Sequence, residues 1–372
     1  MFVALAIWVK ELTGSSAAAG VVFLLFAAPA LAAPVLGLYA DRFPRRSLLI
    51  LTDLATAAVV LSLLLVRGSG WVWLVYLVTF LYGLSGQLYY AARSGLVVSM
   101  LPGERLADAN SVLASIDQGA QIGAPIVGAA LFAFAGAGSV VVVDAATFLV
   151  SVGMLSAIRV RDISRPEQGE RWALEVMAGL RHILASPGLR RLVGVTAGVV
   201  AVVGLIQAPI FSLIDRGLHR PPTFLGVIIT LQGIGSIAGS LIAAWTINRL
   251  GELRAAGASL VMAGLALALF PIAAVPTVLP ATFVIGAGVA IFLVAYTTLL
   301  QRSTPASLQG RVFAAGEAAT SVPNTISIGV GAALVAAVSF RVIFAACAAG
   351  VVVVSLLLFR STAPPAVEVT AD

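Results

Sequence analysis

The chain has 372 residues, of which 60% are hydrophobic and only 10% are charged, and its mean hydropathy is +1.07. A soluble domain carries charge on about a quarter of its residues, so this composition excludes a water-soluble globular protein and indicates a polytopic membrane protein. The net charge of +6 would suit a nucleic-acid partner only if the basic residues gathered on one soluble face. These residues are instead scattered through short loops, so we expect no nucleic-acid partner.

The first apolar run, from Met1 to Val9, has about half the length of a membrane crossing, which needs ~20 residues of helix. The first helix is therefore predicted to be truncated, either because the true start lies upstream or because the chain is a shortened version. A short interfacial segment is the alternative.

Full-length apolar segments follow the opening stub and predict eleven crossings, with glycine, alanine and proline frequent inside them, as in closely packed membrane helices. These segments are 17–38, 47–66, 71–92, 109–135, 138–158, 189–211, 222–246, 255–275, 277–300, 310–337 and 340–359. We expect an all-α membrane protein with a bundle over 1–158, a cytoplasmic linker over 159–188, a second bundle over 189–359 and a cytoplasmic tail over 360–372.

The hairpin between the first two full segments reads Gly37-Leu-Tyr-Ala-Asp41-Arg42-Phe-Pro-Arg45-Arg46. A carboxylate followed by three arginines is costly in hydrocarbon, and arginine-rich short loops mark the cytoplasmic side. Alternating the later loops from this hairpin places 17 of the 22 Lys and Arg residues inside. We therefore expect a multi-pass protein of the cell membrane with a cytoplasmic C-terminus.

This hairpin resembles the signature between the second and third helices of the major facilitator superfamily, with Pro44 in place of the usual glycine. The amino-acid sequence of this hairpin is similar to that found in the branch of macrolide-efflux and enterobactin-export proteins. The resemblance implies two six-helix bundles and a gating role for Gly37, Asp41, Arg42, Arg45 and Arg46. In the family, the carboxylate at Asp41 faces the positive end of the eleventh helix, which begins here near Gly310. Orientation by charge alone is the alternative, and it is favoured for Arg45 and Arg46.

The linker and an internal repeat divide the chain into halves. Between Arg159 and Pro187, apolar residues recur at helical spacing, which predicts an amphipathic helix along the inner membrane surface. Residues 101–131 align without a gap onto 304–334. Transporters built from two related bundles show such repetition, with the binding site near the middle of the membrane.

Four acidic residues lie inside predicted crossings and are candidates for proton coupling, because carboxylates in a membrane bundle are expensive and readily hold protons. We favour Asp117 first and Glu317 second, although either is a possible partner of Arg105 or Arg311. Asp53 could instead pair with the basic hairpin, and Asp144 could make a hydrogen bond that holds two helices together.

A substrate cavity is expected to be mostly apolar with few polar groups. The candidates, of which we expect fewer than half to contact substrate, are Tyr82, Gln87, Tyr89, Gln118, Gln121, Gln207, Phe211, Gln232, Phe292, Tyr296 and Asn324. No arginine or lysine is predicted in a helix centre, which favours a neutral or cationic amphiphile. The segment around Pro125 resembles the small-residue motif of antiporters in the superfamily, although close helix packing explains it equally well.

Cysteine and histidine are too few for a metal centre. Cys347 is the single cysteine, and His182 and His219 are predicted on opposite sides of the membrane, so we expect no metal, no cofactor and no enzyme activity. The sequence has no phosphate-binding Gly-x4-Gly-Lys-Ser/Thr motif for ATP. These patterns predict a monomeric, proton-coupled secondary transporter that exports a hydrophobic or amphiphilic small molecule. A siderophore or lipid exporter of the same fold and a non-transporting remnant are the alternatives.

Overall fold

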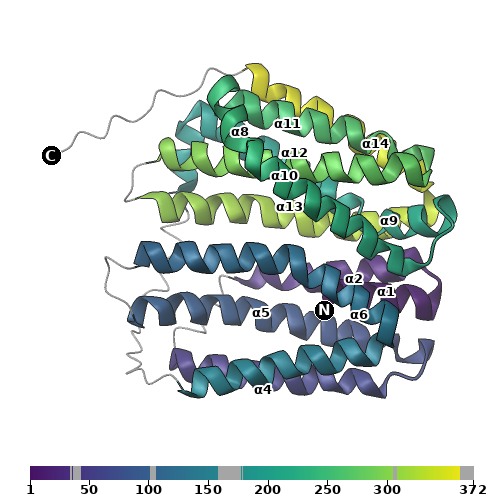
Figure 1. Ribbon diagram of the computed structural model, residues 1–372. Coiled ribbons are helices and arrows are strands. Elements are labelled where there is room, and N and C mark those ends of the chain that lie inside the picture. The colour runs from purple at the N-terminus through teal and green to yellow at the C-terminus, as the bar shows by residue number, and fades with distance from the viewer. Residues whose placement is uncertain are drawn as a thin grey trace. The chain divides into compact units, whose positions relative to one another are not determined.

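Figure 1 shows a computed structural model of the protein, which describes residues 1–33, 36, 43–100, 106–157, 177, 179–304 and 308–360. The regular elements in these ranges are all helices, so the all-α prediction is confirmed. The chain divides into two compact units, Met1–Glu170 and Arg171–Asp372. Each unit is described separately.

The first unit contains the following elements in chain order: α1 (Phe2–Thr13), α2 (Ser16–Ala27), η1 (Ala28–Ala32), α4 (Arg45–Leu61), η2 (Ser62–Leu65), η3 (Ser69–Trp71), α5 (Val72–Met100) and α6 (Leu106–Ala157). The opening stub is helical, and Ile7 and Val9 are fully buried. It therefore packs inside the unit, which disagrees with the interfacial alternative.

Two crossings meet within α6. Gly136 interrupts the helix with φ 75° and ψ 179°, a backbone conformation that favours glycine. The hydroxyl of Ser139 donates to the Gly136 carbonyl at 2.7 Å and helps to hold the break. The predicted pair of segments on either side of this glycine is thereby confirmed.

The second unit contains α8 (Pro187–Leu205), α9 (Pro209–Ser212), the π-helix η5 (Leu213–Gly217), η6 (Pro222–Phe224), α10 (Leu225–Leu250), α11 (Glu252–Leu267), η7 (Phe270–Ile272), α12 (Val275–Arg302), α13 (Gln309–Ala337), α14 (Phe340–Leu356) and η9 (Leu357–Arg360). Proline begins several of these pieces, as expected for a residue that lacks a backbone N–H and suits the first helical turn.

Nine helical stretches in the described part of the chain are long and apolar enough to cross a membrane. This count takes Gly123–Ala157 as one stretch and leaves out the shorter apolar helix Ser16–Ala32. Adding the shorter helix gives ten apolar stretches in the described residues, close to the eleven predicted crossings, and Gly136 interrupts the longest helix, α6.

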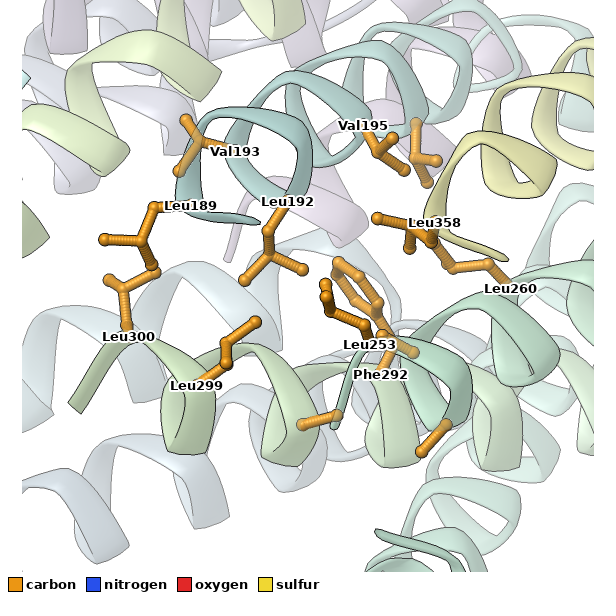
Figure 2. Close-up of a cluster of buried hydrophobic side chains, with 14 of the residues drawn as sticks. Leu189, Leu192, Val193, Val195, Leu253, Leu260, Phe292, Leu299, Leu300 and Leu358 are labelled. Carbon is orange, nitrogen blue, oxygen red and sulfur yellow. The ribbon is translucent and has the colours of Figure 1, made fainter. Parts of the chain in front are cut away.

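A cluster of aliphatic side chains joins several helices of the second unit. Figure 2 shows leucines and valines of α8 facing Leu253 and Leu260 of α11, Phe292 of α12 and Leu358 of η9. Because lipid is as apolar as these side chains, their close contacts stabilise the bundle mainly through dispersion.

The described end of the linker packs against the same unit. Ile183 is only 2% exposed, and the Nε2 atom of His182 lies 3.2 Å from the carbonyl oxygen of Ser303. Gly179 faces the backbone of α13, where an added Cβ would lie 2.1 Å from the carbonyl oxygen of Arg311. This segment therefore contacts the ends of α12 and α13.

Candidate functional site

An ion pair in the described part of the first unit joins Arg93 on α5 to Asp117 on α6. The Nη1 atom of Arg93 lies 3.0 Å from Oδ1 of Asp117, and Nη2 lies 2.6 Å from Oδ2. The two side chains are 23% and 27% exposed, and the Arg93 guanidinium also lies over the ring of Tyr90 at 4.8 Å. These two contacts are the charge-assisted, two-bond pairing that arginine typically makes with a carboxylate.

Sequence reasoning missed Arg93 because it ended the predicted crossing 71–92 one residue before it. The helix instead continues to Met100, so Arg93 lies about two turns inside it. Arg93 is therefore a basic residue inside a helix but away from its middle, so the expectation that no arginine or lysine lies in a helix centre is not contradicted. The signal was available: the next seven residues contain no proline, and the first strong helix breaker is Pro102. Arg105, the partner considered for Asp117, lies outside the described residues.

Asp53 is the most deeply buried acidic residue of the described chain, at 1% exposure. Its carboxylate accepts a hydrogen bond from the Ser151 hydroxyl, which joins α4 to α6, while its Oδ2 atom has no hydrogen-bond partner. A buried carboxylate with one unsatisfied oxygen is costly when charged. Asp53 therefore links α4 to α6 through one carboxylate oxygen, while the other oxygen is buried without a partner.

Asp144 lies on the same face of α6 as Ser151, two turns away. It accepts a hydrogen bond from the Tyr82 hydroxyl of α5 and interacts with the amino group of Met1, and its Oδ2 atom has no hydrogen-bond partner. Tyr82 in turn contacts the rings of Phe26 and Phe148, at centroid distances of 6.2 and 5.9 Å. The hydrogen bond between helices, which was the competing interpretation of Asp144, is thus present.

Only part of the gating hairpin lies in the described ranges. Gly37, Asp41 and Arg42 fall outside them, and α4 begins at Arg45. Arg46 donates from Nε to the Leu155 carbonyl at 2.8 Å and from Nη2 to the Ser156 carbonyl at 2.7 Å. These carbonyls belong to the last turn of α6, where acceptors have no partner within the helix. Arg46 therefore joins the start of α4 to the end of α6, in addition to any effect on orientation.

Replacing Arg46 with alanine is expected to lower the stability of the purified protein by about 1 kcal/mol, because two charge-assisted hydrogen bonds are lost at a half-exposed site. The measurement is the midpoint of thermal unfolding in detergent. The matched control is Arg254→Ala, in the first turn of α11, because Arg254 is exposed and makes no hydrogen bond or ion pair within the described chain. Equal midpoints for the two variants would contradict the role of Arg46.

Glu317 lies exposed on α13, within the crossing Arg311–Ala337. Its charge acts on Tyr296 of α12. The hydroxyl of Tyr296 lies against Gly316, where an added Cβ would come within 2.8 Å of that oxygen. The ring of Phe292 is 6.0 Å from that of Tyr296. Glu317 thus lies near the ring of Tyr296, which Phe292 contacts on the core side.

The remaining cavity candidates differ in exposure. Phe211 has no exposed surface and Phe292 is 7% exposed within the cluster of Figure 2, so both are packing residues in this conformation. Asn324 packs against Gly204 of α8. The half-buried candidates are Gln87, Tyr89, Gln207 and Gln232. The side chains of Gln118 and Gln121 lie outside the described set. Within the described residues, no cluster of His, Cys, Asp and Glu could hold a metal ion.

Comparisons with known proteins agree with this fold. The family model described as Major Facilitator Superfamily matches residues 1–213 and 193–371. An uncharacterized MFS-type transporter of Bacillus subtilis (strain 168), YfiS, is 24% identical over 336 residues, covering 87% of this chain and 79% of the relative. The multidrug resistance protein MdtG of Klebsiella pneumoniae (strain 342) is 27% identical over 383 residues, covering 98% and 89%.

Two solved structures are similar in fold. A bacterial homologue of the iron transporter ferroportin in an inward-facing state has a TM-score of 0.70 at 16% identity, covering 96% of this chain and 95% of that one. An auto-inhibited peptide transporter of the POT family has a TM-score of 0.72 at 15% identity, covering 100% and 96%. At these identities the likeness concerns the fold alone.

Proposed function

The chain belongs to the major facilitator superfamily, and from this premise we propose that it is a proton-coupled secondary transporter that exports a hydrophobic or amphiphilic small molecule by alternating access. It acts as a monomer in the cell membrane, with its C-terminus in the cytoplasm. The Klebsiella relative is named a multidrug resistance protein, which supports export of foreign amphiphiles. The absence of a Gly-x4-Gly-Lys-Ser/Thr motif from the sequence supports an ion gradient as the energy source.

The ion pair between Arg93 and Asp117 is the observation that carries this proposal. Paired charges within membrane helices are rare and typically belong to ion or substrate pathways. A proton that binds Asp117 neutralises its carboxylate and removes one acceptor from the Arg93 guanidinium, so the two-bond contact is lost. Release of that proton restores it. Protonation thus switches a contact between α5 and α6, and this switch is the proposed coupling step.

The basic hairpin at residues 37–46 gates access from the cytoplasmic side in this proposal. Asp41 and Arg42 hold the closed state, and Arg46 keeps the start of α4 attached to α6. The half-buried polar residues Gln207 and Gln232 of the second unit supply hydrogen bonds to the substrate in this proposal.

Transport by inside-out membrane vesicles tests the proposal. We expect the vesicles to accumulate chloramphenicol, a neutral amphiphile, when their interior is acidified, and a protonophore to abolish the accumulation. Vesicles from cells without the protein provide the control. Accumulation that depends on ATP but not on the proton gradient would refute the coupling. No accumulation of chloramphenicol, ethidium or erythromycin would favour the non-transporting alternative.

A further inference from the structure

Glu317 is an exposed carboxylate that lies well inside a membrane crossing, away from the end of its helix. It lies eight residues after the start of α13, which corresponds to about 12 Å along the helix axis. Acidic side chains at such positions face a bundle interior or a water-filled cavity, because contact with lipid is too costly. Its exposure therefore indicates a surface that meets water or a ligand.

No basic residue in the described part of the chain pairs with this carboxylate. Arg302, on the neighbouring α12, forms an ion pair with Glu252. Arg311, on the same helix, is six residues earlier, so its direction differs from that of Glu317 by about 120° around the axis. Among the described residues, the negative charge of Glu317 thus has no basic partner and is available to a ligand.

The internal repeat identifies equivalent positions in the two halves and shows that their residues differ here. The register that aligns 101–131 with 304–334, continued upstream, places Tyr296 where the first half has Arg93. It also places Asp117 at Thr320, one helical turn from Glu317. In the first unit a guanidinium neutralises the carboxylate, whereas in the second unit a phenol ring stands in its place. In the described part of the second unit, a carboxylate without a basic partner therefore lies beside an aromatic ring.

A carboxylate next to aromatic rings is the arrangement that recognises organic cations. The π-face of a tyrosine attracts a quaternary or alkylated ammonium group, and a nearby carboxylate adds a direct charge interaction. Phe292 supports the ring of Tyr296 from the core of the unit, and Gly316 lets the phenol lie against α13. The rings are thus held in place before any ligand binds.

We infer that Glu317 is a specificity-determining residue that binds the cationic group of an amphiphilic substrate, with Tyr296 providing the aromatic face. The inference rests on the proposed transport function and names the substrate class: lipophilic monocations. In this arrangement Asp117, the partner of Arg93, binds the proton, and Glu317 determines which substrates bind. Neutral amphiphiles do not need this carboxylate.

Equilibrium binding of a matched pair of probes to the purified full chain tests the inference. Tetraphenylphosphonium carries a permanent charge, and triphenylphosphine oxide is a neutral molecule with similar rings. We expect Glu317→Gln to weaken tetraphenylphosphonium binding roughly tenfold or more, which corresponds to the loss of one charge contact. Binding of triphenylphosphine oxide should not change. Glu317→Asp and Tyr296→Phe should keep the preference for the cation, and Tyr296→Leu should reduce it.

The control is Glu252→Gln, which makes the same chemical change at the beginning of α11. It should leave the affinity for both probes unchanged, and thermal unfolding should verify that each variant is folded. A folded Glu317→Gln protein that binds tetraphenylphosphonium like the wild type would overturn the inference. Proton-driven uptake of chloramphenicol by the same variant separates the two proposals, because that uptake tests transport without using the cation site.

Discussion

Asp117→Asn is expected to abolish proton-driven accumulation of chloramphenicol in vesicles, while exchange of the drug down its concentration gradient stays measurable. Asparagine has nearly the shape of aspartate, so it can keep one hydrogen bond to Arg93 at the site where the native pair makes two of 2.6 and 3.0 Å. It cannot bind and release a proton. The movement of the substrate therefore continues, but it is no longer linked to the proton gradient. Uphill accumulation should fall to the level of vesicles without the protein.

Variants of the partner sharpen this test. Arg93→Lys keeps the positive charge but loses the planar two-bond geometry, so it should reduce coupled transport less than Asp117→Asn does. Glu252→Gln serves as the matched control, because it removes a carboxylate that is paired with Arg302 at the end of α12. Unchanged uphill transport by Asp117→Asn would move the coupling role to Glu317, Asp144 or Asp53.

Much of the fold could be predicted because each membrane helix is a long, continuous apolar run in the sequence. A run of ~20 apolar residues identifies a crossing without any knowledge of its neighbours. The hairpin before α4 and the interruption at Gly136 are likewise visible as short breaks in apolar runs. The end of α5 was the exception, because Arg93 was interpreted as the start of a loop. A single charge in a helix does not end it when a partner from another helix satisfies that charge.

The candidate site was predicted only in part, because its chemistry depends on contacts between helices. The sequence identified the four acidic residues, but their partners come from positions that spacing does not connect: Arg93, Ser151 and Tyr82. Aromatic residues were ambiguous for the same reason. Phe292 and Tyr296 lie one turn apart on α12, yet the first is a core residue and the second reaches Gly316.

The second prediction with a large expected effect concerns the close packing between α10 and α12. An added Cβ at Gly286 would lie 2.0 Å from the backbone carbonyl oxygen of Gln232, and one at Gly235 would lie 2.0 Å from that of Phe283. These carbonyls belong to helix backbones and cannot turn aside as a flexible side chain would. Gly286→Ala is therefore expected to push the two helices apart and to lower both the yield of folded protein and the midpoint of thermal unfolding.

The control for Gly286 has to separate crowding from the intrinsic effect of alanine in a helix. Gly194 lies within α8, and an added Cβ there meets no atom within 4 Å. Alanine favours a helix over glycine by about 1 kcal/mol, so Gly194→Ala should leave the midpoint unchanged or raise it. Crowding typically costs about 1–3 kcal/mol even where side chains can adjust, and at Gly286 this cost exceeds the helical gain. If both variants unfolded at the same temperature, the close approach of α10 and α12 would not contribute to stability.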